Sequence, residues 1–175
     1  MGYKHFHHRQ IEPLWHFGCV HVSLYEYEFM KELKDFGRHG LSYTTFEYSA
    51  LELSRPSFSA NNVKVIVSVT VTNTGTVSGS DVVQLYVALP PTPEYTHVPL
   101  MLKAYAKVHD LAPGKSKAVS MELDKYAVSY WEDRISRWVV ESGKYVIFVG
   151  KSSDLKELKL SAEFVLEQGF EWNGL

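Results

Sequence analysis

Histidine side chains are the first residues in this sequence that could do chemistry, because neutral imidazole is a common metal ligand. Four of them, His5, His7, His8 and His16, lie near the amino terminus, and His5 and His7 would share one face of an extended segment. A zinc ion usually requires a third protein ligand in a rigid frame, and no cysteine or aspartate cluster lies beside these histidines. We therefore expect no metal site, and we expect His39 to pack in or tie a loop.

Acidic side chains could supply general acids, general bases or nucleophiles. The carboxylates that fall on or beside the predicted strands and turns are Glu47, Glu52, Asp81, Glu122, Asp124, Glu132 and Asp133. The strand pattern places them at exposed positions, so we expect each to be solvated. The sequence also lacks a glycine-rich phosphate loop, a Gly-x-Ser-x-Gly elbow and a Cys-x-x-Cys pair. We therefore assign no catalytic, cofactor-binding or metal-binding residue, and we expect no cofactor.

Aromatic residues, which make up 14% of the chain, could form a platform on which sugar rings stack. The candidates are Tyr95, Tyr105, Tyr126, Tyr130, Trp131, Trp138 and Trp172. The alternative is that Trp131 and Trp138 fill the core or seal a contact with another domain, since such contacts also need aromatic surface. We favour this structural role. Without the neighbouring domain, an aromatic patch of this kind would stay exposed and promote association.

Length and composition set the outer limits. A chain of 175 residues with 45% hydrophobic and 22% charged residues suffices for one domain of ordinary size with a buried core. The net charge of −2 and the absence of a basic stripe argue against nucleic acid or an anionic membrane as partner. Cys19 is the only cysteine, so no intrachain disulfide can form. We find neither a run of about 18 apolar residues nor the apolar core of a signal peptide.

The elements that must position these residues are mostly strands. Valine occupies positions 63, 65, 67, 69 and 71, and polar residues alternate with most of them, which is the period of a strand with one buried face. The turn residues Asn73, Gly75 and Gly79 follow, and then a second apolar run over 82–87. A slip of one residue in register would expose the whole set of valines. The pair therefore predicts two adjacent core strands.

Similar patterns predict further short strands over 48–53, 102–111, 119–123, 138–140, 145–149 and 158–166. Turn signals separate them every 8–12 residues or so, a spacing that favours an antiparallel β-sandwich. Apolar residues at three- and four-residue steps predict one short helix, at about 24–36, in an otherwise irregular amino-terminal extension. The predicted fold class is therefore mainly β.

The stretch Val71-Thr72-Asn73-Thr74-Gly75, followed by Gly79 and then by Asp81-Val82-Val83-Gln84-Leu85-Tyr86-Val87, resembles a family signature. It is similar to the fibronectin type III-like domain of glycoside hydrolase family 3 enzymes, above all β-glucosidases. Segments 102–108, 111–116, 130–132 and 138–153 continue the resemblance in the family's order. The resemblance implies an immunoglobulin/fibronectin type III-like sandwich over 46–168, with a short tail at 169–175.

Segments 2–6, 11–18 and 39–46 resemble the end of the α/β-sandwich domain of these enzymes and its linker, so we assign 1–45 to that role. His7 stands where an aspartate is usual. The family joins Phe17-Gly18 almost directly to Gly40-Leu41-Ser42-Tyr43, whereas here residues 19–38 intervene. Our hypothesis is that 19–38 is a translated intron or a gene-model error. The alternative is a true surface insertion that forms an amphipathic helix.

The resemblance further implies that the catalytic nucleophile and acid/base belong to domains upstream of this chain, since no segment here matches either motif. We therefore expect a non-catalytic part of a β-glucosidase. Its partners would be the catalytic domains of the parent enzyme, it would meet a β-glucoside only through that parent, and the parent would be extracellular. Two alternatives stay open: a free-standing β-sandwich module that binds a glycan or a protein, and an active small hydrolase. The segment 2–18 favours the interpretation as part of a β-glucosidase, because an independent module has no use for the tail of another domain.

Overall fold

The computed structural model describes residues 42–54, 57–59, 62–91 and 100–174. The predicted helix at 24–36, the segment 19–38, His5, His7, His8, His16, His39 and Tyr95 lie outside these residues. Every element in the described part is a strand. Within that part, no helix is long and apolar enough to cross a membrane.

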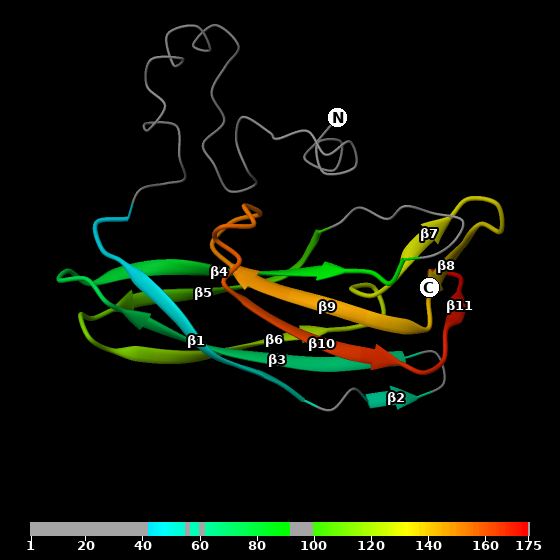
Figure 1. Ribbon diagram of the computed structural model, residues 1–175, viewed down its shortest axis with the longest axis horizontal. Helices are drawn as coiled ribbons and strands as arrows, with labels where there is room; N and C mark the ends of the chain where they lie inside the picture. Colours follow the sequence, from blue (N-terminus) through cyan, green and yellow to red (C-terminus); the bar gives the residue numbers. More distant parts are fainter. Residues whose placement is uncertain (1–41, 55–56, 60–61, 92–99, 175) are drawn as a thin grey trace, which may run out of the picture.

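The strands form three sheets, and all their pairings are antiparallel. One sheet has the order β1-β3-β2 with β6 also paired to β3, a second has the order β10-β9-β4-β5, and a small third sheet has the order β11-β8-β7. The bounds are β1 Phe46–Leu53, β2 Ser57–Ser59, β3 Asn62–Asn73, β4 Gly79–Ala88, β5 Met101–Leu111, β6 Ser116–Leu123, β7 Tyr130–Glu132, β8 Arg137–Val140, β9 Gly143–Gly150, β10 Leu160–Leu166 and β11 Phe170–Trp172. The two larger sheets pack face to face, and the small sheet lies at one end (Figure 1). The predicted antiparallel sandwich is confirmed.

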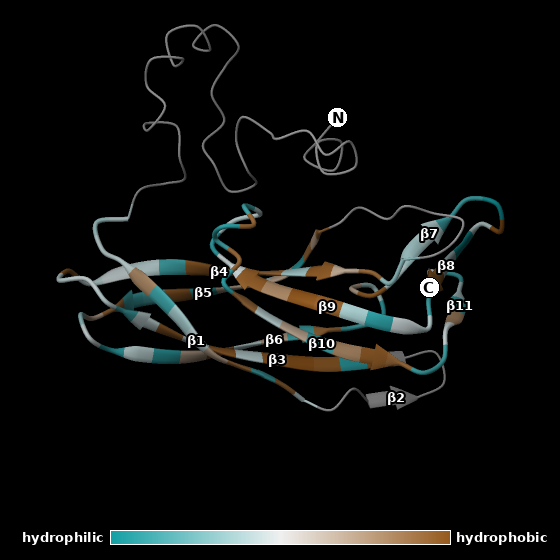
Figure 2. Ribbon diagram, in the orientation of Figure 1, coloured by the Kyte–Doolittle hydropathy of each residue, from teal (hydrophilic) through white to brown (hydrophobic). Residues whose placement is uncertain are grey.

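The core lies between the two larger sheets. The five valines of β3 that alternate from 63 to 71 are at most 1% exposed. They face Val83, Leu85 and Val87 of β4 and a matching row on β9, all within one hydrophobic cluster. Figure 2 shows the hydrophobic residues along the middle of β3, β4 and β9. Alternation therefore identified the inner face correctly, because a strand turns every second side chain to the same side.

The last long strand begins later than the sequence pattern predicted. β10 starts at Leu160, whereas the apolar alternation suggested 158. Residues 154–158 turn back instead, with the amide of Glu157 donating to the carbonyl of Asp154 (2.8 Å). This turn packs so closely on Gly150 that a Cβ atom there would lie 2.8 Å from Leu158 Cδ2. Leu158 thus packs over the end of β9 and does not join the ladder.

Two tyrosine hydroxyl groups tie the sandwich internally. Tyr145 is fully buried, its ring stacks on Phe164 with centroids 5.2 Å apart, and its hydroxyl donates to the carbonyl of Glu141 (2.9 Å). Tyr48 on β1 donates to Asp81 Oδ2 on β4 (2.8 Å), which links the two sheets. Burial raises the pKa of both tyrosines, and the Asp81 carboxylate adds to the rise at Tyr48. Both hydroxyls therefore stay protonated donors at neutral pH.

Candidate functional site

Four of the seven candidate carboxylates, Asp81, Glu122, Asp124 and Glu132, each have their own bonding partner. Asp81 accepts from Tyr48, and Glu122 pairs with Lys64 at 2.8 Å across β6 and β3. Asp124 accepts from the backbone amides of residues 126 and 127 and so closes a turn. Within the described residues, no group of three or more His, Cys, Asp or Glu side chains is placed to hold a metal ion. Each of these carboxylates thus has a structural role.

The prediction that all seven carboxylates are exposed is wrong for Glu132, which is 8% exposed, and for Asp81, which is partly buried. Glu132 Oε1 accepts from the backbone amide of Arg134 (3.0 Å) and from Arg134 Nε (3.2 Å). The guanidinium supplies the opposite charge that a buried carboxylate requires. β7 has only three residues, which is too short for alternation to reveal the inward face of Glu132.

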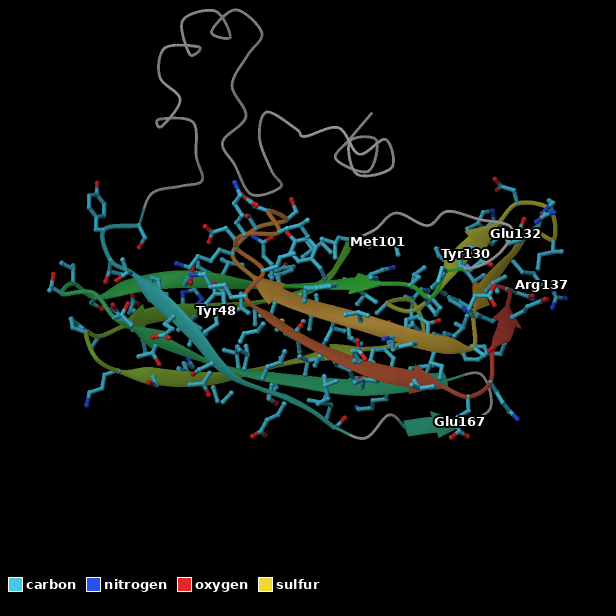
Figure 3. All side chains as sticks on the ribbon, in the orientation of Figure 1. Tyr48, Met101, Tyr130, Glu132, Arg137 and Glu167 are labelled. Atoms are coloured by element: carbon cyan, nitrogen blue, oxygen red, sulfur yellow. The ribbon has the colours of Figure 1, made fainter. Side chains whose placement is uncertain are left out.

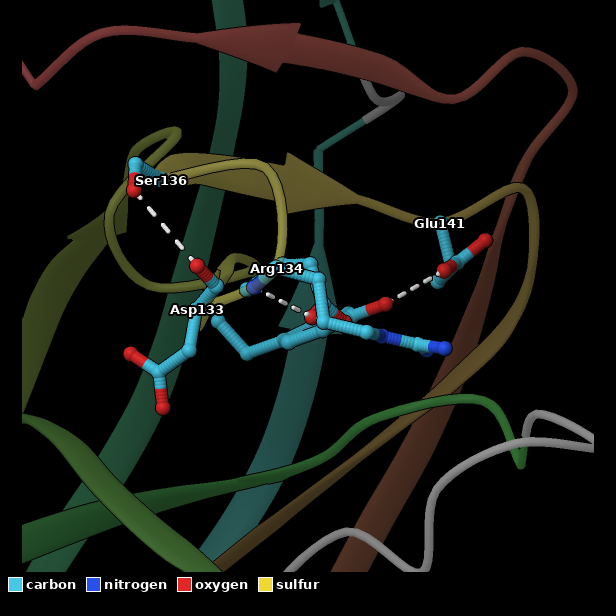
Figure 4. Close-up of polar contacts among 6 residues, drawn as sticks. Asp133, Arg134, Ser136 and Glu141 are labelled. Atoms are coloured by element: carbon cyan, nitrogen blue, oxygen red, sulfur yellow. Dashed lines mark hydrogen bonds and ion pairs between the residues drawn. The ribbon is translucent and has the colours of Figure 1, made fainter.

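Through Arg134, Glu132 belongs to a polar group around β7 and β8, in which Figure 4 labels Asp133, Arg134, Ser136 and Glu141. In the same group, the hydroxyl of Tyr130 donates to Glu141 Oε1 (2.7 Å), and Ser136 Oγ donates to the carbonyl of Asp133 (3.4 Å). Figure 3 shows Tyr130, Glu132 and Arg137 together at one end of the sandwich, with Tyr48 toward the opposite end. These bonds fix the hairpin between β7 and β8. Tyr130 is thereby used structurally.

Four of the seven candidate aromatic residues come together beside this hairpin, and we call Tyr126, Trp131, Trp138 and Trp172 the aromatic end. Trp138 stacks on Trp172 with centroids 5.6 Å apart and planes at 16°. Tyr126 meets Trp172 edge to face at 4.6 Å, and Trp131 meets Trp138 in the same way at 5.8 Å. Lys125 Nζ lies 4.1 Å from the Trp172 ring centroid, within cation–π range. The cluster joins β7, β8 and β11 to the turn after β6.

This geometry favours packing over sugar binding. A stacking platform offers open, nearly coplanar ring faces to the ligand, whereas Trp138 and Trp172 cover each other, and Lys125 lies over Trp172. Trp131 and Tyr126 stay 45% and 47% exposed, but each stands steeply to Trp138, at 71° and 72°. The aromatic end is therefore a small satellite core with two half-exposed rings on its rim.

Sequence reasoning missed a contrast between the outer faces of the two larger sheets. The outer face of β3 and β6 is largely polar apart from Ile66, with hydroxyl pairs Ser68–Ser120 (3.0 Å) and Thr72–Ser116 (2.8 Å). In a sandwich with both outer faces in water, this is the expected pattern. The alternation of side chains would have shown the contrast if the outward positions of β4, β5 and β9 had been read together.

On the other sheet the outward positions are largely apolar. Leu102, Tyr86 and Phe148 lie side by side in the register of β5, β4 and β9, and Val146 is the next outward residue on β9. Tyr105 on β5 is 71% exposed. We call Tyr86, Leu102, Tyr105, Val146 and Phe148 the apolar outer face.

The segment after β9 reaches part of this face, where Gln84 Nε2 donates to the carbonyl of Lys151 (2.6 Å). Tyr86 in turn donates its hydroxyl hydrogen to Gln84 Oε1 and is 2% exposed. Of the five residues of the apolar outer face, Tyr86 is buried, Leu102, Val146 and Phe148 are partly buried, and Tyr105 is exposed.

Comparison with known proteins places the sandwich in a family. A family model described as a fibronectin type III-like domain matches residues 81–153. The chain is 36% identical over 181 residues to a probable β-glucosidase I of Aspergillus terreus, covering 100% of this chain and 18% of that protein. It is 37% identical over 157 residues to the thermostable β-glucosidase B of Acetivibrio thermocellus, covering 87% of this chain and 17% of that protein.

Solved structures agree. The β-glucosidase of Kluyveromyces marxianus in complex with glucose matches with a TM-score of 0.74 and 32% identity, over 100% of this chain and 18% of that one. The GH3 β-glucosidase of Bifidobacterium adolescentis matches with a TM-score of 0.64 and 31% identity, over 82% of this chain and 20% of that one. This chain thus spans about one fifth of the length of its relatives. It therefore corresponds to the fibronectin type III-like part of the glycoside hydrolase family 3 β-glucosidases.

Proposed function

We propose that this chain is the non-catalytic, supporting part of a β-glucosidase whose other domains hydrolyse terminal β-D-glucosyl residues. The observation that carries the proposal is the match along the whole chain to only 18% of a β-glucosidase. The local chemistry agrees, because a retaining glycosidase needs two carboxyl groups about 5–5.5 Å apart around an open site. Four of the seven candidates, Asp81, Glu122, Glu132 and Asp124, are instead bonded to separate partners: Tyr48, Lys64, Arg134 and a backbone turn.

The partner that we propose for the sandwich is the set of catalytic domains of the same polypeptide. The apolar outer face supports this proposal, because apolar side chains occupy outward positions of this sheet and Tyr105 stays exposed there, as at a face that another domain could cover. The polar hydroxyl pairs on the opposite sheet suit a face in contact with water. We also propose that the parent enzyme is extracellular, a proposal that rests on the family resemblance alone.

The boundaries we propose keep 1–45 as the end of the preceding domain and its linker, with 46–168 as the fibronectin type III-like domain and 169–175 as its tail. Residues 170–172 of that tail form β11 and pair with β8. We keep the hypothesis that 19–38 is not native to the enzyme. Its support is the sequence junction that remains after its removal, where Phe17-Gly18 runs into His39-Gly40-Leu41.

The purified chain is expected to release no nitrophenol from an aryl β-glucoside above the buffer blank, because the reaction needs two carboxyl groups around one site, whereas Asp81, Glu122, Asp124 and Glu132 are each bonded to a separate partner. The measurement is absorbance over hours at high protein concentration. The K. marxianus β-glucosidase serves as the positive control under the same conditions. Hydrolysis that co-purifies with the chain and scales with its concentration would refute the non-catalytic role.

A further inference from the structure

The family signature between β3 and β4 binds the chain segment that enters the sandwich. Asn73 ends β3, is fully buried and uses its whole side-chain amide. Its Oδ1 accepts from Thr44 Oγ1 (2.6 Å) and from the amide of Gly75 (3.0 Å), while its Nδ2 donates to the carbonyls of Val77 (2.8 Å) and Leu111 (2.7 Å). Two donors and two acceptor sites are the full capacity of an asparagine amide. An aspartate would turn acceptors toward two carbonyls and could not replace it.

Two glycines of the signature make room for the same threonine. A Cβ atom at Gly75 would overlap Thr44 Oγ1 and lie 2.9 Å from the amide nitrogen of Thr45. A Cβ atom at Gly79 would lie 2.6 Å from Thr44 Cγ2 and 3.3 Å from Phe46 Cζ. Thr44 is consequently 7% exposed although it precedes the first strand. We call Thr44, Asn73, Gly75 and Gly79 the junction clamp.

The residues that follow Thr44 are also bonded to the sandwich or buried in it. The amide of Thr74 donates to the carbonyl of Thr45 (2.8 Å), and Phe46 is 8% exposed. Two residues further on, the hydroxyl of Tyr48 donates to Asp81, which also belongs to the signature. Tyr43, directly before the clamp, is 96% exposed. The chain therefore passes from open solvent into a fully bonded site within one residue, at the end of the sandwich where β1 begins (Figure 1).

A simpler explanation is that the signature only closes the turn between β3 and β4. The bonds from Asn73 to Gly75 and Val77 would be enough for that purpose. Gly79 does not serve the turn, because it stands at the start of β4, where glycine weakens a strand. The atoms that a side chain there would meet belong to Thr44 and Phe46. The signature is thus shaped around the entering segment.

We propose that the junction clamp is a rigid mount, which fixes the direction in which the preceding polypeptide leaves the sandwich. The proposal rests on the proposed function, since it takes the preceding polypeptide to be the rest of a β-glucosidase. A flexible linker would need neither a buried side-chain amide such as that of Asn73 nor glycines at positions where a side chain would collide with the linker. Here the exposed Tyr43 is followed at once by the buried Thr44, which donates to Asn73 at the end of β3. The catalytic domains would therefore be held in one orientation relative to the sandwich.

Chymotrypsin treatment of the full chain tests the mount, because cleavage after Phe46 requires residues 44–46 to leave their site. Thr44→Val removes the Oγ1 donor with little change of shape. We expect cleavage that creates an amino terminus at Glu47 to be about tenfold faster in this variant, as the loss of one buried hydrogen bond predicts. The matched control is Thr72→Val, which removes a hydroxyl that bonds Ser116 on the exposed face. The control should be cleaved at the wild-type rate.

A second readout addresses rigidity directly. The ¹H–¹⁵N heteronuclear NOE of residues 44–46 should equal that of β3 in the wild type and fall in Thr44→Val, while β3 itself is unchanged. Equal cleavage of Thr44→Val and Thr72→Val, or low NOE values at 44–46 in the wild type, would overturn the proposal. Neither readout depends on catalysis. Glucoside hydrolysis by the chain would therefore refute the proposed function and leave the mount standing, and a failed mount would leave the non-catalytic role intact.

Discussion

Replacing Leu85 by alanine is expected to lower the free energy of unfolding by about 2–5 kcal/mol. Leu85 is fully buried in the middle of β4, and β4 is the strand that pairs with both β5 and β9. Truncation removes apolar burial and leaves a cavity that the two sheets cannot close without breaking register. Urea unfolding followed by tryptophan fluorescence measures the change.

The matched control is Val165→Ala on β10, where the side chain is 55% exposed. A surface substitution of this kind should change the free energy of unfolding by less than about 0.5 kcal/mol. The slope of free energy against urea should be the same in both variants, since the fold is unchanged. Similar losses in the two variants would show that the core is not where the structure places it.

Replacing Trp138 by alanine is expected to cost about 3 kcal/mol, at the lower end for a tryptophan truncation because this side chain is only partly buried. Trp138 stacks on Trp172 and makes a T-shaped contact with Trp131, so its loss removes the centre of the aromatic end. β8 and β11 should then separate, since only three residue pairs join them. Near-ultraviolet circular dichroism reports the loss of packing, and urea unfolding reports its free energy.

Trp131→Ala is the comparison, because Trp131 is 45% exposed and meets the cluster through Trp138. Its loss should cost about 1 kcal/mol, as expected for one aromatic pair. If the cluster were a sugar-binding platform, Trp131→Ala would be the more harmful substitution, because the exposed ring of Trp131 would contact the ligand. Its loss would then weaken ligand binding and leave stability unchanged. Equal destabilisation by the two substitutions would contradict a cluster centred on Trp138.

The sequence predicted the sandwich because most of its long strands carry a strong two-residue period. The valines from 63 to 71 and the run from 82 to 87 fell on the inner faces of β3 and β4. The shortest strands were not predicted, because the prediction depends on a two-residue period. β2 and β11 have three residues each, too few for a period to show. Glu132 was misjudged on β7 because no pattern of that length separates an inward from an outward carboxylate.

The junction clamp shows what a sequence pattern leaves out. The signature residues Asn73, Gly75 and Gly79 were visible, and their resemblance to a family was clear, but their shared contact was not. Thr44 lies 29 residues before Asn73, and only the pairing of β1 with β3 brings the two together. The apolar outer face was likewise hidden, because it is assembled from strands that are adjacent in space but distant in sequence.

Sequencing the messenger RNA across codons 18–39 and upstream of codon 1 tests most directly whether this sandwich is one part of a β-glucosidase. We predict a message that continues upstream in frame through the catalytic domains, to a polypeptide about five times the length of this chain, as the 18% coverage of relatives implies. We also predict that codons 19–38 are spliced out. A message that begins at Met1 and encodes only the 20.0 kDa chain would contradict the proposal that the sandwich is mounted on catalytic domains.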